Sequence, residues 1–175
     1  MQLAKTYLDQ LVDYPAQIMA KISEDKYCVG LIRNKSFSEI GDEDKDYVLE
    51  NHIFDYQYVD ENTEEATAYI WVEVEIPSVE NSQVKGVSVY VTIACHKEFM
   101  KLNKDKHILL GNRRDNLVRY VDRILNNYFA EKDEKHIGIG KLTLKSVRTL
   151  TPINRFAMRE LTYRIPDFNI VKVTE

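Results

Sequence analysis

Cysteine and histidine stand side by side at positions 95 and 96, at the end of the apolar segment VSVYVTIACH. A thiol beside an imidazole is the pair that cysteine nucleophiles use, because a nearby base favours the reactive thiolate. Successive side chains of a strand, however, point to opposite faces. We therefore expect Cys95 to be a buried thiol and His96 to lie at the surface or in an interface, so that the two form no catalytic pair.

Two further patterns suggest phosphate or magnesium chemistry. The segment GIGK at 138–141 is glycine-rich, but a phosphate-binding loop needs four residues between its glycines and a helix after the lysine. The pattern after Lys141 predicts a strand, so we interpret the segment as the entry to a hairpin.

Glu73 and Glu75 would share one strand face, as a metal-binding carboxylate pair would, yet their strand offers no basic partner. A charged outer face is the interpretation we prefer.

The segment DEDKD resembles the start of a calcium loop. It places Asp42, Asp44 and Asp46 at alternate positions, as that loop does. The sixth position is Tyr47 where the loop requires glycine, and the twelfth is Ile53 where it requires glutamate. The turn and the bidentate ligand are both missing, so the pattern indicates a solvated acidic segment.

The cysteines and the remaining histidines carry no metal-binding spacing. Cys28 and Cys95 are far apart in sequence, and we expect both to be free thiols. His52, His107 and His136 are scattered, so surface or loop positions are the default expectation. The sequence predicts no metal and no cofactor.

Composition indicates one folded domain spanning residues 1–175. Hydrophobic residues make up 44% of the chain and charged residues 30%, which is enough apolar surface for a core. No apolar run approaches a membrane-spanning length, and the start MQLAKTYLDQ lacks the features of a signal peptide. We expect a soluble intracellular product with no membrane partner.

Charge is distributed unevenly along the chain. Residues 39–83 contain fourteen acidic residues and one basic residue, whereas residues 135–172 contain eight basic residues and two acidic ones. Such asymmetry suits contact with nucleic acid, a membrane or another charged surface. It also suits subunits that meet head to tail. Both interpretations remain open from the residues alone.

The first third of the chain predicts helix followed by loop. Residues 3–12 have helical periodicity, and Pro15 ends that helix or begins a second short turn. Residues 28–32 form an apolar run of uncertain type. Residues 34–66 are predicted to be an exposed acidic loop inserted into the domain, although 52–59 within them has the alternation of a strand.

The remainder predicts two hairpins and one helix. Residues 69–76 and 87–95 alternate apolar and polar side chains and read as a long antiparallel hairpin. Residues 141–153 and 156–165 form a closing hairpin, and its alternation changes phase near Ser146, as a bulge would produce. This order predicts an α+β fold in which an antiparallel or mixed sheet is covered on one face by helices.

The helix predicted over 111–129 is strongly amphipathic. Asn112 is its expected N-cap, and Asp115 with Arg119 is a favourable i to i+4 pair. We expect its charged residues to occupy the surface: Arg113, Arg114, Arg119, Asp122 and Arg123. Its apolar stripe should pack on the sheet: Leu117, Val118, Val121, Ile124, Leu125 and Tyr128.

Charged positions supply the candidate interaction residues. Basic side chains of the closing hairpin could hold phosphates without reading base sequence, or could form an electrostatic interface with a protein. Acidic side chains and Trp71 would provide the complementary surface. The candidates are Lys141, Lys145, Arg148, Arg155, Arg159, Arg164, Glu73, Glu75, Asp42, Asp44, Asp46 and Trp71.

The order of elements resembles the tail-terminator and tail-completion proteins of tailed bacteriophages. The segments that carry the resemblance are YIWVEVEI, VSVYVTIAC, RRDNLVRYVDRIL, GKLTLKSVRTLTP and RELTYRI, preceded by an N-terminal helix. The acidic segment at 34–66 is longer than the family pattern needs. The resemblance implies a non-enzymatic virion protein, made in the host bacterial cytoplasm. It also implies a hexameric or twelvefold ring at the head-tail junction that contacts connector or tail proteins.

A second hypothesis is an intracellular nucleic-acid-binding module. It would use the basic closing hairpin, and nonspecific contact with DNA is its expected mode. An enzyme ranks third, because no acid, base and nucleophile converge in the sequence.

Overall fold

The computed structural model describes residues 7–58, 65–75, 79–80, 83–84, 87–127 and 142–165. Four α-helices and seven strands are assigned in these ranges, with two short 3-10 helices. The helices are α1 (Tyr7–Glu24), α2 (Lys26–Arg33), α3 (Asp42–Asn51) and α4 (Arg113–Asn127), and the 3-10 helices are Phe37–Glu39 and Lys97–Phe99. The strands are β1 (Ile53–Phe54), β2 (Ala68–Glu75), β3 (Val79–Glu80), β4 (Gln83–Val84), β5 (Val87–His96), β6 (Thr143–Ile153) and β7 (Phe156–Ile165).

The main sheet has five strands in the order β1-β2-β5-β7-β6. Two long antiparallel hairpins, β2 with β5 and β6 with β7, join through the antiparallel pairing of β5 with β7. The short strand β1 adds to β2 in parallel and makes the sheet mixed. The α+β prediction is confirmed, as is the predicted bulge, because the register of β6 against β7 shifts between Leu144 and Ser146.

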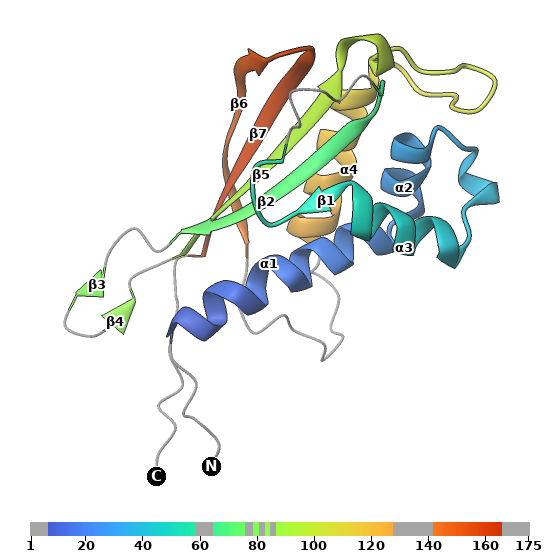
Figure 1. Cartoon of the computed structure of the whole chain (residues 1–175). Coiled ribbons are helices and arrows are strands. Elements are labelled where there is room, and N and C mark those ends of the chain that lie inside the picture. The colour runs from blue at the N-terminus through green and yellow to red at the C-terminus, as the bar shows by residue number, and fades with distance from the viewer. Residues whose placement is uncertain are drawn as a thin grey trace.

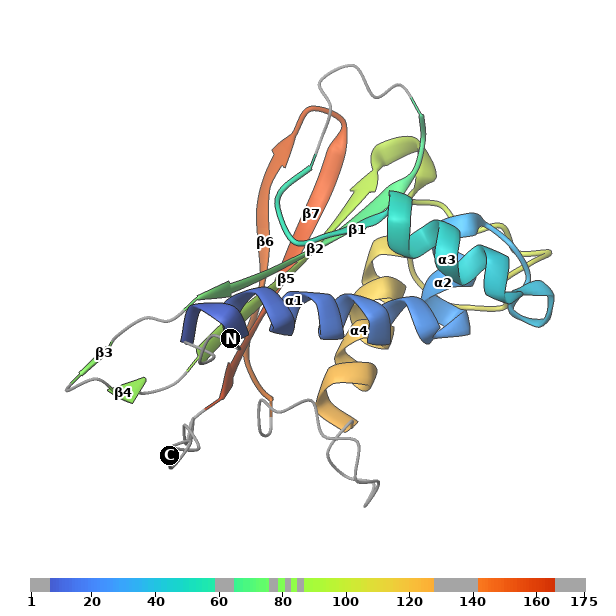
Figure 2. The same cartoon turned by 60° about the horizontal axis from the view of Figure 1, so that its bottom comes forward.

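The helices cover one face of this sheet (Figures 1 and 2). Alternate side chains of the strands point toward them, as the period-two pattern requires. The apolar stripe of α4 packs there with Leu117, Val121 and Leu125 fully buried; Tyr128 lies outside the described residues. The strand residues of this core are Ile70, Val72, Val87, Val89, Val91, Ile93, Cys95, Leu161 and Tyr163.

The N-terminal region is more helical than the sequence predicts. Helix α1 continues through Pro15, so the expected break there is wrong. Ile18 and Ile22, beyond the proline, are fully buried against the core, and this packing offsets the backbone hydrogen bond that proline cannot make. The run at 28–32 belongs to α2, which Asp25 caps by accepting hydrogen bonds from two backbone N–H groups.

The acidic segment is not a continuous loop. Helix α3 occupies its centre, and only Ile53–Phe54 of the strand predicted at 52–59 is a strand. Asp42, Glu43 and Asp44 stand in the first turn of α3, where negative charge is favourable against the positive end of the helix dipole. In this segment the consecutive acidic residues therefore mark the start of a helix, where the sequence analysis predicted a loop.

Arg113 is buried at the start of α4, contrary to the expected surface position. It is 1% exposed. Its guanidinium donates to the carbonyl oxygens of Leu31 and Phe99 and to Oδ1 of Asn34 at 2.9 Å, and it stacks on the Phe99 ring. Burial lowers the pKa of Arg113 to about 10, which still leaves it charged at neutral pH. One side chain thus ties α4 to α2 and to the segment after β5.

We expect Arg113→Met to destabilise the fold by about 3 kcal/mol, because carbonyl groups buried around the guanidinium lose their donors. Urea denaturation followed by circular dichroism measures the change. The matched control is Arg123→Met on the exposed face of the same helix, which should change the free energy of unfolding by less than about 0.5 kcal/mol. Equal stability of the two variants would show that the Arg113 contacts do not stabilise the fold.

Candidate interaction surface

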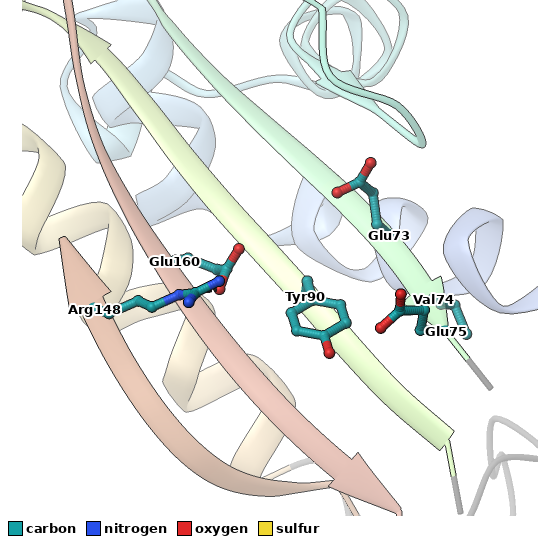
Figure 3. A pocket seen from close by; sticks show the side chains of 6 residues that line it. All are labelled: Glu73, Val74, Glu75, Tyr90, Arg148 and Glu160. Atoms are coloured by element: carbon teal, nitrogen blue, oxygen red, sulfur yellow. Dashed lines mark hydrogen bonds and ion pairs between the residues drawn. The ribbon is translucent and has the colours of Figure 1, made fainter. Parts of the chain in front are cut away.

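The face of the sheet turned away from the helices is the first candidate surface. Its cross-strand neighbours are Glu73 with Tyr90, and Glu160 with Arg148. Together with Val74 and Glu75, these side chains line an open cavity of about 450 Å³ (Figure 3). Because Glu73 and Glu75 are on adjacent outward positions of β2, the predicted charged outer face is present.

Some of the polar side chains that line this cavity pair with one another. Arg148 Nε donates to Glu160 Oε1 at 2.7 Å, so this arginine is neutralised by its own chain. A hydrogen bond from the Tyr90 hydroxyl to Glu75 raises the pKa of Tyr90. Within the described ranges, no group of three or more His, Cys, Asp or Glu side chains is placed to hold a metal ion. The free carboxylate oxygens can instead accept hydrogen bonds from basic side chains of a partner.

Trp71 points to this outer face as predicted but is not available for contact. It is 3% exposed and belongs to a second apolar cluster with Tyr69, Ala94, Phe156 and Met158. Its indole N–H donates to the carbonyl of Tyr58 at 3.1 Å, because the segment after β1 folds over it. The covering segment itself presents exposed aromatic rings, since Tyr56 is 54% exposed and Tyr58 is 38% exposed.

The predicted basic residues do not form one patch. Arg159 points to the helix face and pairs with Asp115 of α4 at 3.1 Å, and this contact, with Arg114, replaces the expected pair of Asp115 with Arg119. Arg148 pairs with Glu160 on the other face. Arg148 is exposed although it is paired, and the other exposed candidates of the hairpin are Lys145, Arg155 and Arg164; Lys141 lies outside the described residues.

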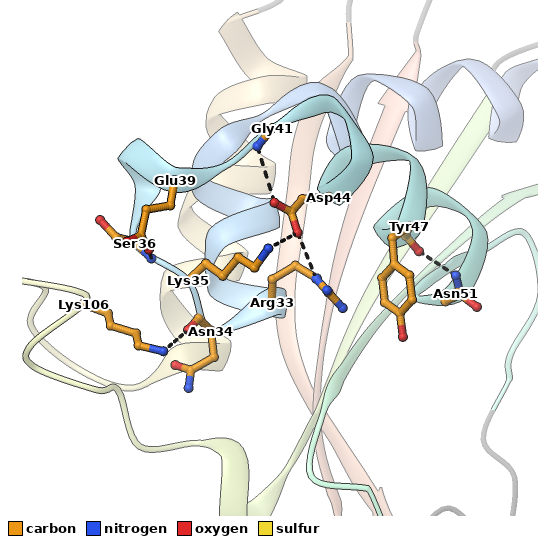
Figure 4. Close-up of polar contacts among 10 residues, drawn as sticks. All are labelled: Arg33, Asn34, Lys35, Ser36, Glu39, Gly41, Asp44, Tyr47, Asn51 and Lys106. Atoms are coloured by element: carbon orange, nitrogen blue, oxygen red, sulfur yellow. Dashed lines mark hydrogen bonds and ion pairs between the residues drawn. The ribbon is translucent and has the colours of Figure 1, made fainter.

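The three acidic candidates of α3 have different environments. Asp46 is exposed, and Asp42 pairs with Lys45 at 2.6 Å on the surface. Asp44 is buried and accepts from Lys35 Nζ at 2.7 Å and Arg33 Nε at 3.2 Å (Figure 4). The three carboxylates therefore do not surround a common point, and Asp44 stabilises the fold where the sequence predicted a solvated side chain.

Cys95 and His96 point away from each other, as strand geometry requires. Burial raises the pKa of the Cys95 thiol to about 12, which keeps it protonated. Cys28 is also a buried free thiol, so both cysteine predictions are confirmed. The predicted surface position of His96 is wrong: its ring is fully buried against Phe156, and its Nδ1 accepts from the backbone N–H of Glu98.

The segment between β5 and α4 presents a surface that the sequence analysis missed. Ile108 is 98% exposed and Leu110 is 94% exposed, whereas the neighbouring His107 is buried. A signal was present in KLNKDKHILLGN, where an apolar run stands inside a lysine-rich loop. Exposed large apolar side chains close together are typical of an interaction site.

Comparison with family models gives one match, to the YomW family over residues 20–165. The chain belongs to the YomW family. That family is phage-derived, in agreement with a phage origin for this protein. Neither the curated proteins nor the solved structures include a match to the chain. In the described part of this YomW protein, every helix is too short or too polar to cross a lipid bilayer.

We predict that Asp44→Asn lowers the free energy of unfolding by about 2 kcal/mol at pH 7, because charge-assisted hydrogen bonds are lost. The hydrogen bond from Lys35 lowers the pKa of Asp44, so its contribution is present above about pH 4 and disappears as the pH falls through the folded-state pKa. Chemical denaturation at pH 7 and pH 2.5 measures this difference. Asp42→Asn, at an exposed pair, is the control and should change the free energy of unfolding far less than Asp44→Asn does. A pH-independent difference for Asp44→Asn would contradict the assignment.

The burial of His107 should make the protein less stable in mild acid. Burial, followed by the charges of Arg113 and Lys106, lowers its pKa below the ordinary value of 6.5. Below about pH 6.5 the His107 side chain is therefore protonated more readily in the unfolded chain than in the folded one. The free energy of unfolding falls as the pH drops through this range. We expect the drop in melting temperature from pH 7.5 to 5.5 to be smaller in His107→Gln. A residual drop is expected from buried His52, whose pKa is also lowered by burial. An unchanged pH dependence would exclude His107 as a source.

Proposed function

We propose that this YomW protein is a non-enzymatic structural protein of a tailed-phage virion. It forms a ring of six or twelve copies at the head-tail junction or tail end and contacts connector or tail proteins there. The observation that carries the proposal is the match of residues 20–165 to a phage-derived family. It is made in the host bacterial cytoplasm and ends in the particle.

The arrangement of the surfaces supports assembly. One face of the sheet is covered by helices (Figure 1). The other carries the carboxylates of Glu73 and Glu75 (Figure 3), and the segment after β1 adds the exposed Tyr56 and Tyr58. Ile108 and Leu110 project from a separate loop. Chemically different surfaces on one subunit favour heterologous contacts, which close into rings when the rotation permits.

The nucleic-acid hypothesis receives less support from the closing hairpin. Arg148 and Arg159 are engaged by carboxylates of the same chain and point to opposite faces. A phosphate backbone would be held by a continuous row of free basic groups. Weak, nonspecific DNA contact through Lys145, Arg155 and Arg164 is the remaining form of this hypothesis.

The test of the ring is a mass measurement with imaging. Purified protein at micromolar concentration should give a discrete species of six or twelve subunits by mass photometry and ring particles by negative-stain electron microscopy. Binding to DNA fragments at low and physiological salt serves as the comparison for the rival function. A strict monomer that also fails to join phage tails or connectors, and that binds DNA with steep salt dependence, would replace the ring proposal with the rival one.

A further inference from the structure

The loop of residues 101–111 is held in a defined conformation at its base. The backbone N–H of Arg113 donates to Met100 O at 2.8 Å, which closes the loop where it leaves and re-enters the fold. Asn116 Nδ2 donates to Leu110 O at 2.8 Å, and Lys106 Nζ donates to Asn34 O at 2.8 Å. Buried His107 packs on Phe37 from the inside. The loop is therefore fixed at several points along its length.

This fixed loop turns two large apolar side chains to the outside. Ile108 and Leu110 are almost fully exposed, while Leu109 between them packs against the core. Leu102, at the other end of the loop, is buried. The fold thus buries other apolar residues of this loop and leaves Ile108 and Leu110 in water. Contact of these two side chains with another surface would lower the free energy by removing apolar area from water.

The loop that carries the apolar tip is rich in exposed lysines. Lys101, Lys104 and Lys106 are exposed in the same loop, against a single carboxylate, Asp105. A partner that fits this tip must present apolar or aromatic area bordered by negative charge.

The protein itself carries such a surface near β1 and β2. We call it the acidic tyrosine surface, and it consists of the exposed residues Asp55, Tyr56, Tyr58, Glu73 and Glu75. The Trp71 indole fixes the backbone of Tyr58 beside β2, so the tyrosines lie next to the strand that carries the two glutamates. No lysine or arginine occurs in the sequence from residue 46 to residue 75.

We propose that the 101–111 loop of one copy docks on the acidic tyrosine surface of the next copy. Ile108 and Leu110 pack on Tyr56 and Tyr58, and the loop lysines face the carboxylates. In both views the 101–111 loop lies beside α2, whereas the segment after β1 lies toward the β6–β7 hairpin (Figures 1 and 2). The two surfaces are therefore different parts of the subunit. The contact is therefore heterologous and suits a ring. This inference rests on the proposed ring and specifies its interface.

The first experiment replaces the apolar tip. In the double variant Ile108→Asp and Leu110→Asp, the protein concentration for half-maximal assembly, measured by sedimentation velocity, should rise at least about tenfold. Val12→Asp is the matched control, because Val12 is an apolar residue of α1 that is 72% exposed, and it should leave assembly within about twofold of wild type. Equal melting temperatures of the variants and wild type establish that folding is intact.

The second experiment tests the identity of the surface that receives the tip. Lys101→Glu with Lys104→Glu in one protein, and Glu73→Lys with Glu75→Lys in another, should each weaken self-assembly, and mixing the two should restore assembly in alternating order. If the aspartate variant assembles like wild type, the loop contact is wrong while the ring proposal stands. If the mixture fails to assemble, the acidic tyrosine surface is not the acceptor. A wild type that is monomeric at all concentrations, and that also fails to join phage tails or connectors, overturns both the ring and this contact.

Discussion

The buried guanidinium of Arg113 is the interaction on which the arrangement of this protein depends. It joins the end of α2, the segment after β5 and the first turn of α4 through hydrogen bonds to backbone carbonyls and Asn34. A charged group is kept in the interior only when its donors are satisfied, which they are here. Because the same residue closes the base of the 101–111 loop through its backbone N–H, the core contact also determines where Ile108 and Leu110 project.

The two faces of the sheet have different environments. On the helix side, valines and isoleucines form a continuous core with the stripe of α4, and the buried Tyr163 hydroxyl donates to Asp122 of that helix at 3.1 Å. On the other side, a small aromatic cluster around Trp71 is covered by the segment after β1, and beyond it the surface becomes acidic. The aromatic cluster explains how a single layer of helices suffices, since the outer face protects part of its own apolar area.

Periodicity predicted most of this architecture, and tertiary context decided the rest. The alternation of β2 and β5 and the stripe of α4 are local patterns, and the structure confirms them with the bulge near Ser146. Pro15 within α1 and the helical start at Asp42 depended on packing and on the helix dipole, which composition does not reveal. The burial of Arg113 depended on Leu31, which is 82 residues away in sequence, and the burial of Asp44 depended on Lys35 and Arg33, which lie 9 and 11 residues before it and outside its helix.

For the candidate surfaces, charge counts along the chain were a poor guide. Arg148, Arg159 and Asp44 carry charge that the fold itself neutralises, so they add little to the outer field. The exposed apolar tip directly follows three lysines in sequence, and this polar context concealed it from a reading of composition. Exposure, which only the folded chain defines, separates side chains that can meet a partner from those that hold the fold.

The proposed contact between copies, from the 101–111 loop to the acidic tyrosine surface, should be visible by hydrogen–deuterium exchange at protein concentrations below and above the assembly midpoint. We expect assembly to slow exchange in peptides covering 101–111, 55–58 and 68–75, and to leave exchange on the exposed side of α4 unchanged. Slowed exchange confined to the edge strand β6, or none in the loop, would contradict it.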